Sequence, residues 1–143
     1  MTSLSRFLTD EHQHCDDRFA TTENAVADAD WTLAGSEFQC FFDDMQTHFS
    51  HEENVLFPAF EARTGMRGGP TSVMREEHRQ MNEMFAAMRD NLARRDGNGY
   101  LGLSETLLML MRQHNLKEEN ILYPMADQAL AGERDALLAQ MAM

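Results

Sequence analysis

The stretch HFSHEENVLFPAFE (residues 48–61) returns in altered form as HNLKEENILYPMAD (residues 114–127), 66 positions further along the chain. In both stretches a histidine is followed four residues later by a glutamate, and a proline comes six residues after that glutamate. The same shift of 66 positions pairs His12 with His78. A match of this kind is hard to obtain by chance, so we expect two related halves with pseudo-twofold symmetry.

Apolar residues recur every three or four positions along most of the chain, which is the period of one face of an α-helix. Val, Ile and Thr are few, and the strict alternation typical of strands does not occur. The segments with the helical period are residues 8–26, 38–56, 74–92 and 107–122. The sequence therefore predicts four amphipathic helices.

Turn-forming residues separate these segments. The breaks lie near residues 29–34, 64–70 and 96–99, and a last one near Gly132 precedes ERDALLAQM (residues 133–141). Short connections favour antiparallel neighbours, so we expect an all-α, up-down-up-down four-helix bundle with a short C-terminal helix. The length of 143 residues suits a single domain over residues 1–143. Pro58 and Pro124 should each kink or end a helix just before them.

The charge of the chain limits the classes of partner. Asp and Glu number 24 against 12 Lys and Arg, a net charge of -12, which would repel nucleic acid or an anionic bilayer. No run of 18 apolar residues occurs, and the first 30 residues lack the order of an export signal. We therefore expect a cytoplasmic protein, with Cys15 and Cys40 as reduced thiols.

Six ionisable residues occupy positions where the helical pattern calls for apolar ones. They are His12, His48, Glu52, His78, His114 and Glu118. A single helical histidine is usually structural or at the surface, but six polar residues in register on inward faces indicate a common metal site. The His-x-x-x-Glu spacing places both side chains one turn apart, about 5 to 6 Å between Cβ atoms. Without a metal such a buried cluster would be costly, because no Lys or Arg lies on the inward stripes to pair with it.

The mixture of nitrogen and oxygen donors favours iron or manganese, with zinc possible, over calcium, magnesium or an iron-sulfur cluster. Six ligands exceed the number that one tetrahedral zinc uses, and the repeat suggests two equivalent ions bridged by Glu52 and Glu118. Each ion would take two histidines. Such a centre leaves an open position for dioxygen, nitric oxide or peroxide, whereas a closed zinc site would only staple the bundle.

These residues carry a resemblance to the hemerythrin-like proteins, also called HHE cation-binding domains, over residues 4–126. The specific part is His12, the HxxxEE segment at His48, His78 in EEHRQ, and HNLKEENILYP at His114. The resemblance implies a four-helix bundle with two oxo- or hydroxo-bridged iron ions, which bind dioxygen reversibly in the oxygen carriers. Other members are implicated in oxygen or iron sensing, nitric-oxide response, or repair of iron centres.

Two departures from the oxygen carriers affect the expected ligands. The carriers have two histidines four residues apart on the third helix, whereas His78 has Met74 and Asn82 at that spacing. Their last helix uses an aspartate at the position of Glu119, but we prefer Glu118 because it repeats Glu52. A centre with one histidine fewer should be more open and more prone to oxidation or turnover.

The leading hypothesis is a di-iron protein that binds dioxygen or nitric oxide for storage, delivery or sensing. The alternative is a redox enzyme that reduces peroxide or nitric oxide, or that repairs iron centres. The sequence leaves open whether any of four neighbouring residues enters the coordination shell: His14, His51, Glu53 and Glu119. Glu53 and Glu119 should point outward or support the ligands from outside the coordination shell. For Tyr100 and Tyr123, core packing is preferred over a role as redox-active neighbours of the metal. The sequence indicates no particular protein partner.

Overall fold

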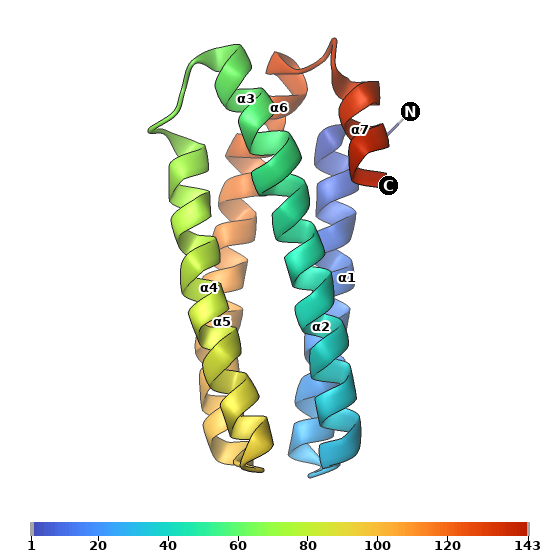
Figure 1. The fold of residues 1–143 in the computed structure, drawn as a ribbon, viewed down its shortest axis with the longest axis vertical. Helices are drawn as coiled ribbons and strands as arrows, with labels where there is room; N and C mark the ends of the chain where they lie inside the picture. Colours follow the sequence, from blue (N-terminus) through green and yellow to red (C-terminus); the bar gives the residue numbers. More distant parts are fainter. Residues whose placement is uncertain (1, 143) are drawn as a thin grey trace.

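Four long helical rods stand side by side in the structure, a computed structural model that describes residues 2–142 (Figure 1). The first and third rods are α1 (Leu4–Ala27) and α4 (Pro70–Ala93). The second consists of α2 (Trp31–His51), η1 (Glu52–Leu56) and α3 (Phe57–Thr64). The fourth consists of α5 (Gly97–Lys117), η2 (Glu118–Leu122) and α6 (Tyr123–Ala129), and a short helix α7 (Arg134–Ala142) follows.

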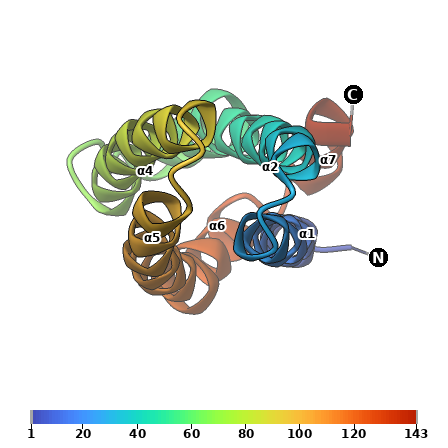
Figure 2. The ribbon, with the colours of Figure 1, turned by 90° about the horizontal axis from the view of Figure 1, so that it is seen from below.

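The rods follow one another around the bundle, so that α1 contacts α2 and α5, and α4 contacts the same two helices from the other side (Figure 2). Each turns back on its predecessor, with the connections 28–30 and 94–96 at one end of the bundle and 65–69 at the other (Figure 1). No strand occurs among residues 2–142. The prediction of an all-α, up-down-up-down bundle with a short C-terminal helix is confirmed.

The first turns of the two halves are built alike. Asp30 accepts a hydrogen bond from the backbone N–H of Leu33, and Asp96 accepts one from that of Gly99, as helix N-caps do. Ala29 and Arg95 precede these caps in the left-handed region, with φ of 55° and 54°. The 66-residue repeat therefore extends beyond the polar residues to the backbone of the turns.

The second and fourth rods each contain a π-helix, which is a wider helical turn. Such turns are rare in proteins as a whole, and those that occur are often found at functional sites. The N–H of Phe57 donates to the carbonyl of Glu52, and the N–H of Tyr123 donates to that of Glu118, five residues back. Pro58 and Pro124 follow directly. A proline ring clashes with the carbonyl four residues earlier in an α-helix, and the wider turn avoids that contact. The expected interruption before each proline is therefore a π-helix, and the rods continue through α3 and α6.

Two apolar clusters fill the bundle, one at each end. The cluster toward the α1–α2 and α4–α5 turns includes Phe19, Phe41, Phe85 and Tyr100, and the other includes Leu8, Leu56 and Phe60. Leu137 and Met141 of α7 join the second cluster. Both cysteines are free, Cys15 buried and Cys40 half-buried. Burial and nearby carboxylates raise the pKa of the Cys15 thiol to about 12, so it stays protonated.

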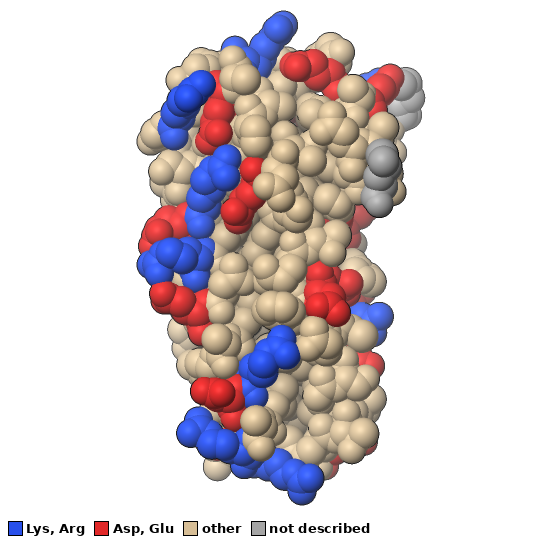
Figure 3. Space-filling model, viewed as in Figure 1, with Lys and Arg blue, Asp and Glu red and all other residues tan. Residues whose placement is uncertain are grey.

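The surface carries both signs of charge. In Figure 3 the basic and acidic side chains are interspersed along the α4 side, where Arg79 forms ion pairs with Glu76 and Glu83. None of the helices in residues 2–142 combines the length and apolar character that crossing a bilayer requires.

The aromatic cluster gives a direct test of the packing. Phe85 is fully buried against the rings of Phe41 and Phe42, at centroid distances of 5.5 and 6.0 Å. Replacing it with alanine should lower the free energy of unfolding by about 3–5 kcal/mol, through lost burial and the cavity left behind. Urea unfolding of the metal-free protein measures this loss. Met109→Ala is the control, because Met109 is 64% exposed and its loss should matter by less than about 0.5 kcal/mol.

Candidate metal centre

The six polar residues singled out in the sequence converge between the two apolar clusters. Four rods contribute them, and all six are buried with at most 4% of their surface exposed: His12, His48, Glu52, His78, His114 and Glu118. The two glutamates are the first residues of the π-helices η1 and η2. The six residues that the helical period and the repeat singled out therefore lie together in the structure. Their role as metal ligands stays a prediction.

The histidines form two pairs, and each glutamate reaches both. The rings of His12 and His48 lie 4.6 Å apart between centroids, and those of His78 and His114 lie 5.0 Å apart. Glu118 Oε1 is 3.0 Å from His12 Nε2 and 3.1 Å from His114 Nε2. Glu52 Oε1 is 3.3 Å from His48 Nε2 and 3.1 Å from His78 Nε2. Each carboxylate thus connects one histidine of each pair.

Two groups of donor atoms are compact enough to hold a cation, with all atoms of a group within 4.8 Å of one another. One group consists of Glu52, His78, His114 and Glu118, and the other of His12, His48 and Glu118. Because Glu118 belongs to both, the geometry offers two adjacent positions that share a carboxylate.

Several of the inward atoms are buried and have no hydrogen-bond partner among the described residues. They are His48 Nε2, His78 Nε2, His114 Nε2, Glu52 Oε1 and Glu118 Oε2. An unsatisfied buried polar group costs about 1–3 kcal/mol, and more when it is charged. A cation placed among these lone pairs would satisfy them together. The nitrogen and oxygen donors present therefore fit a pair of first-row transition-metal ions.

A carboxylate also binds the outer nitrogen of each histidine. The Nδ1 distances are 2.6 Å for His12 to Glu119, 2.8 Å for His48 to Glu11, 2.6 Å for His78 to Glu53 and 2.8 Å for His114 to Glu77. Each Nδ1–H donates to its carboxylate, and in the neutral imidazole that a metal ion requires this leaves the lone pair of Nε2 directed at the centre. Glu53 and Glu119 are therefore partners of the histidines, outside the inner ring of donors.

The part played by Glu11 and Glu77 was not foreseen. The repeat carried the signal, because a shift of 66 relates Glu11 to Glu77 and Glu53 to Glu119. Basic groups hold two of these carboxylates in turn: His51 Nδ1 lies 2.7 Å from Glu11, and Lys117 Nζ binds Glu77.

His14 and His51 do not replace the histidine that the oxygen carriers have on their third helix. His14 is exposed and contacts Asp44 at 2.9 Å, while His51 serves Glu11. At the third-helix positions, Met74 is buried in an apolar cluster and Asn82 accepts a hydrogen bond from Gln46. The centre therefore has four inward histidines within residues 2–142.

Tyr123 differs from the expectation of plain core packing, whereas Tyr100 lies within the aromatic cluster as expected. The Tyr123 hydroxyl lies 2.7 Å from Glu52 Oε2, inside the polar centre. Burial and the two inner glutamates raise its pKa well above the ordinary value of 10.0, so the hydroxyl keeps its proton and donates it. Periodicity does not reveal this role, because phenylalanine would fill the same volume.

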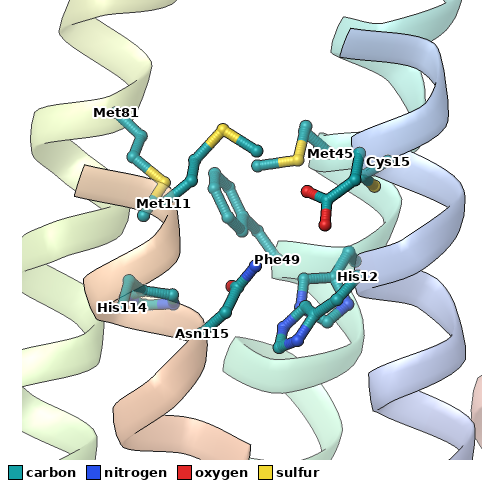
Figure 4. Close-up of a pocket in the computed structure, with 10 residues that line it drawn as sticks. His12, Cys15, Met45, Phe49, Met81, Met111, His114 and Asn115 are labelled. Carbon is teal, nitrogen blue, oxygen red and sulfur yellow. The ribbon is translucent and has the colours of Figure 1, made fainter. Parts of the chain in front are cut away.

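A small cavity of about 10 Å³ adjoins the histidines, with room for about one water-sized molecule. Figure 4 shows the side chains of Met45, Met81 and Met111 gathered on one side of it and the rings of His12 and His114 on the other. The lining opposite the histidine rings therefore includes three apolar, flexible thioether side chains.

Comparisons with known proteins agree with this geometry. A family model described as "Hemerythrin HHE cation binding domain" matches residues 3–126. An "Iron-sulfur cluster repair protein YtfE" from Edwardsiella ictaluri (strain 93-146) is 37% identical over 93 residues, 58% of this chain and 42% of the relative. The protein of that name from Musicola paradisiaca (strain Ech703) is 34% identical over 108 residues, 68% of this chain and 47% of the relative. This chain thus spans less than half the length of these relatives. No solved structure gives a significant match.

The outer carboxylates can be tested separately from the inner donors. Glu77→Gln removes the charge that holds His114 Nδ1, and we expect metal affinity to fall about 10- to 100-fold. Glu76→Gln is the matched control, because its carboxylate lies at the surface beside Arg79. Competition with a chelator measures both variants. Equal affinities in the two would show that the outer carboxylate does not support the histidine.

The metal-free protein should lose stability as pH rises above neutrality. Burial opposes protonation of His78, but the carboxylates of Glu52 and Glu53 prevail and raise its pKa from 6.5 to about 9. The resulting stabilisation is complete below pH 6.5, where the unfolded chain is protonated too, and is lost as pH rises toward 9. Urea midpoints between these values should fall, and fall less in His78→Gln. A midpoint that rises over this interval would contradict the assignment.

Proposed function

Because the chain belongs to the family of hemerythrin HHE cation-binding domains, we propose that its buried donors hold two iron ions, oxo- or hydroxo-bridged. His78 and His114 would hold one ion and His12 and His48 the other, with carboxylate oxygens supplied by Glu52 and Glu118. The observation that carries the proposal is the set of buried nitrogens and oxygens that face one another and have no hydrogen-bond partner within residues 2–142. Manganese and zinc would suit the same donors.

The protein's own residues define what such a centre can do. Iron supplies the ability to bind small molecules and to change oxidation state. The outer carboxylates fix the orientation of the four imidazoles, and the apolar clusters above and below keep bulk water out. The adjoining cavity of about 10 Å³ limits a ligand to roughly the size of dioxygen, nitric oxide or peroxide.

We infer that the chain binds such a molecule for storage, delivery or sensing. Residues 1–143 act as one domain in this proposal, since Leu137 and Met141 of α7 pack into the same apolar cluster as α1 and α3. A cytoplasmic location, which the composition favours, stays a prediction.

A second function, in iron-centre repair or in reduction of peroxide or nitric oxide, is favoured by the relatives. Their name describes them as iron-sulfur cluster repair proteins. These relatives are more than twice as long as the region that matches this chain, so a repair activity of this chain is a proposal.

Iron content tests the centre itself. Metal-free protein loaded anaerobically with ferrous iron and then oxidised should hold about two irons per chain and show near-ultraviolet charge-transfer bands. His78→Ala and Glu118→Ala should lower iron content and thermal stability together, because metal binding is linked to folding. His14→Ala is the control, since that side chain lies at the surface. One iron or none in the parent protein would contradict the proposal, and unchanged iron in both variants would show that the ligands are misassigned.

Stopped-flow spectra of the reduced protein separate the two functions. A charge-transfer band that forms with dioxygen and disappears on its removal supports reversible binding. Repeated turnover of peroxide or nitric oxide supports the enzyme.

A further inference from the structure

The two halves of the repeat differ in the aromatic residue that stacks on His12 of the first rod and on His78 of the third rod. Phe57 lies 5.9 Å from His78 with an interplanar angle of 17°, and Tyr123 lies 5.6 Å from His12 with an angle of 26°. The shift of 66 relates these two aromatic residues. The rings occupy equivalent places, and only the one beside His12 carries a hydroxyl.

A second difference lies on the other side of the same histidines. Phe49 stacks on His78 at 3.9 Å, which places His78 between two phenyl rings. The residue related to Phe49 by the repeat is Asn115, which lines the cavity together with His12. Both departures from the repeat therefore put polar groups on the His12 side.

The Tyr123 hydroxyl has one proton to donate and three neighbours. It lies 2.7 Å from Glu52 Oε2, 3.1 Å from Glu118 Oε1 and 3.1 Å from His12 Nε2. The shortest contact identifies Glu52 as the acceptor, because a hydrogen bond from a hydroxyl to a carboxylate is shorter than one between two neutral groups. Glu52 is then left with Oε1 for other partners.

Glu118 is restricted less, because the Tyr123 hydroxyl lies 3.1 Å from Glu118 Oε1 but 2.7 Å from Glu52 Oε2. Its Oε2 is buried and has no hydrogen-bond partner among the described residues, and its Oε1 faces His12 and His114. The compact donor groups show the same imbalance, since Glu118 belongs to both and Glu52 only to that of His78 and His114.

We propose that Tyr123 is a positioning residue that makes the two metal positions unequal by holding one oxygen of Glu52. The position at His78 and His114 forms a compact group with both carboxylates, whereas the position at His12 and His48 does so with Glu118, and Glu52 reaches it only through Oε1, 3.3 Å from His48 Nε2. The inference rests on the proposed two-ion centre and extends it, because four histidines and two glutamates related by a repeat would otherwise give two equivalent positions.

Stepwise titration of the metal-free protein with cobalt(II), followed by its absorption and by chelator competition, measures the two affinities. The parent protein should bind in two steps at least about tenfold apart, because cation affinity rises with the number of anionic ligands at a position. Tyr123→Phe keeps the stacked ring and frees Glu52 Oε2, so the gap should shrink to less than about threefold. His78→Ala should remove the tighter step, and His12→Ala the weaker one.

Phe57→Tyr supplies the matched variant, because the repeat places its new hydroxyl toward Glu118. The exchange Phe57→Tyr with Tyr123→Phe should reverse the order of the two steps, so that His12→Ala now removes the tighter one. Circular dichroism of each metal-free variant checks that the helices are retained.

Two equal affinities in the parent protein would overturn the inference and leave the two-ion centre standing. An unchanged gap in Tyr123→Phe would overturn it too, and would assign the hydroxyl a purely structural role. Failure to bind a second ion would overturn both this inference and the proposed function.

Discussion

The burial of four imidazoles and two carboxylates at mid-height is the constraint on which the rest of the structure depends. Ionisable groups lose several kcal/mol of hydration each on burial, by order of magnitude, unless other groups replace the water. The protein meets this demand from outside the cluster with a carboxylate at every Nδ1, whereas several inward atoms have no hydrogen-bond partner among the described residues. The apolar clusters at either end then close the site to water.

In each π-helix, one glutamate faces the inner Nε2 atoms of the histidines and the next glutamate binds an outer Nδ1 atom. Glu52 faces the inner nitrogens of His48 and His78, while Glu53, the next residue, binds the outer nitrogen of His78. Successive residues on an α-helix differ by about 100° in direction, and the wide turn that begins at Glu52 sets where both side chains reach. Glu118 and Glu119 repeat this division of labour at His12. The two EEN segments are thus a structural unit in which one glutamate binds inward and the other steadies a histidine on a different rod.

The helices, their order and the six inward residues were predictable, because a period of three to four and a repeat of 66 are local properties of the sequence. The contacts of the outer carboxylates were not, since they join residues as far apart as His12 and Glu119 and depend on how the rods pack. Pro58 indicated an interruption but did not distinguish a π-helix from a kink. Core packing was the preferred interpretation of Tyr123, because hydrophobic periodicity depends on the ring and carries no information about the hydroxyl.

The carboxylates around the histidines also bear on electron loss. Six of them, two inner and four outer, surround the four imidazoles, and Lys117 binds one of the outer four. Such a group of carboxylates attracts a trivalent ion more strongly than a divalent one, because the Coulomb energy grows with the charge of the ion. Partial hydration of Glu53 and Glu119, whose side chains are 36% and 33% exposed, weakens but does not remove the field. The electrostatic surroundings therefore favour the oxidised form of whatever redox metal they enclose.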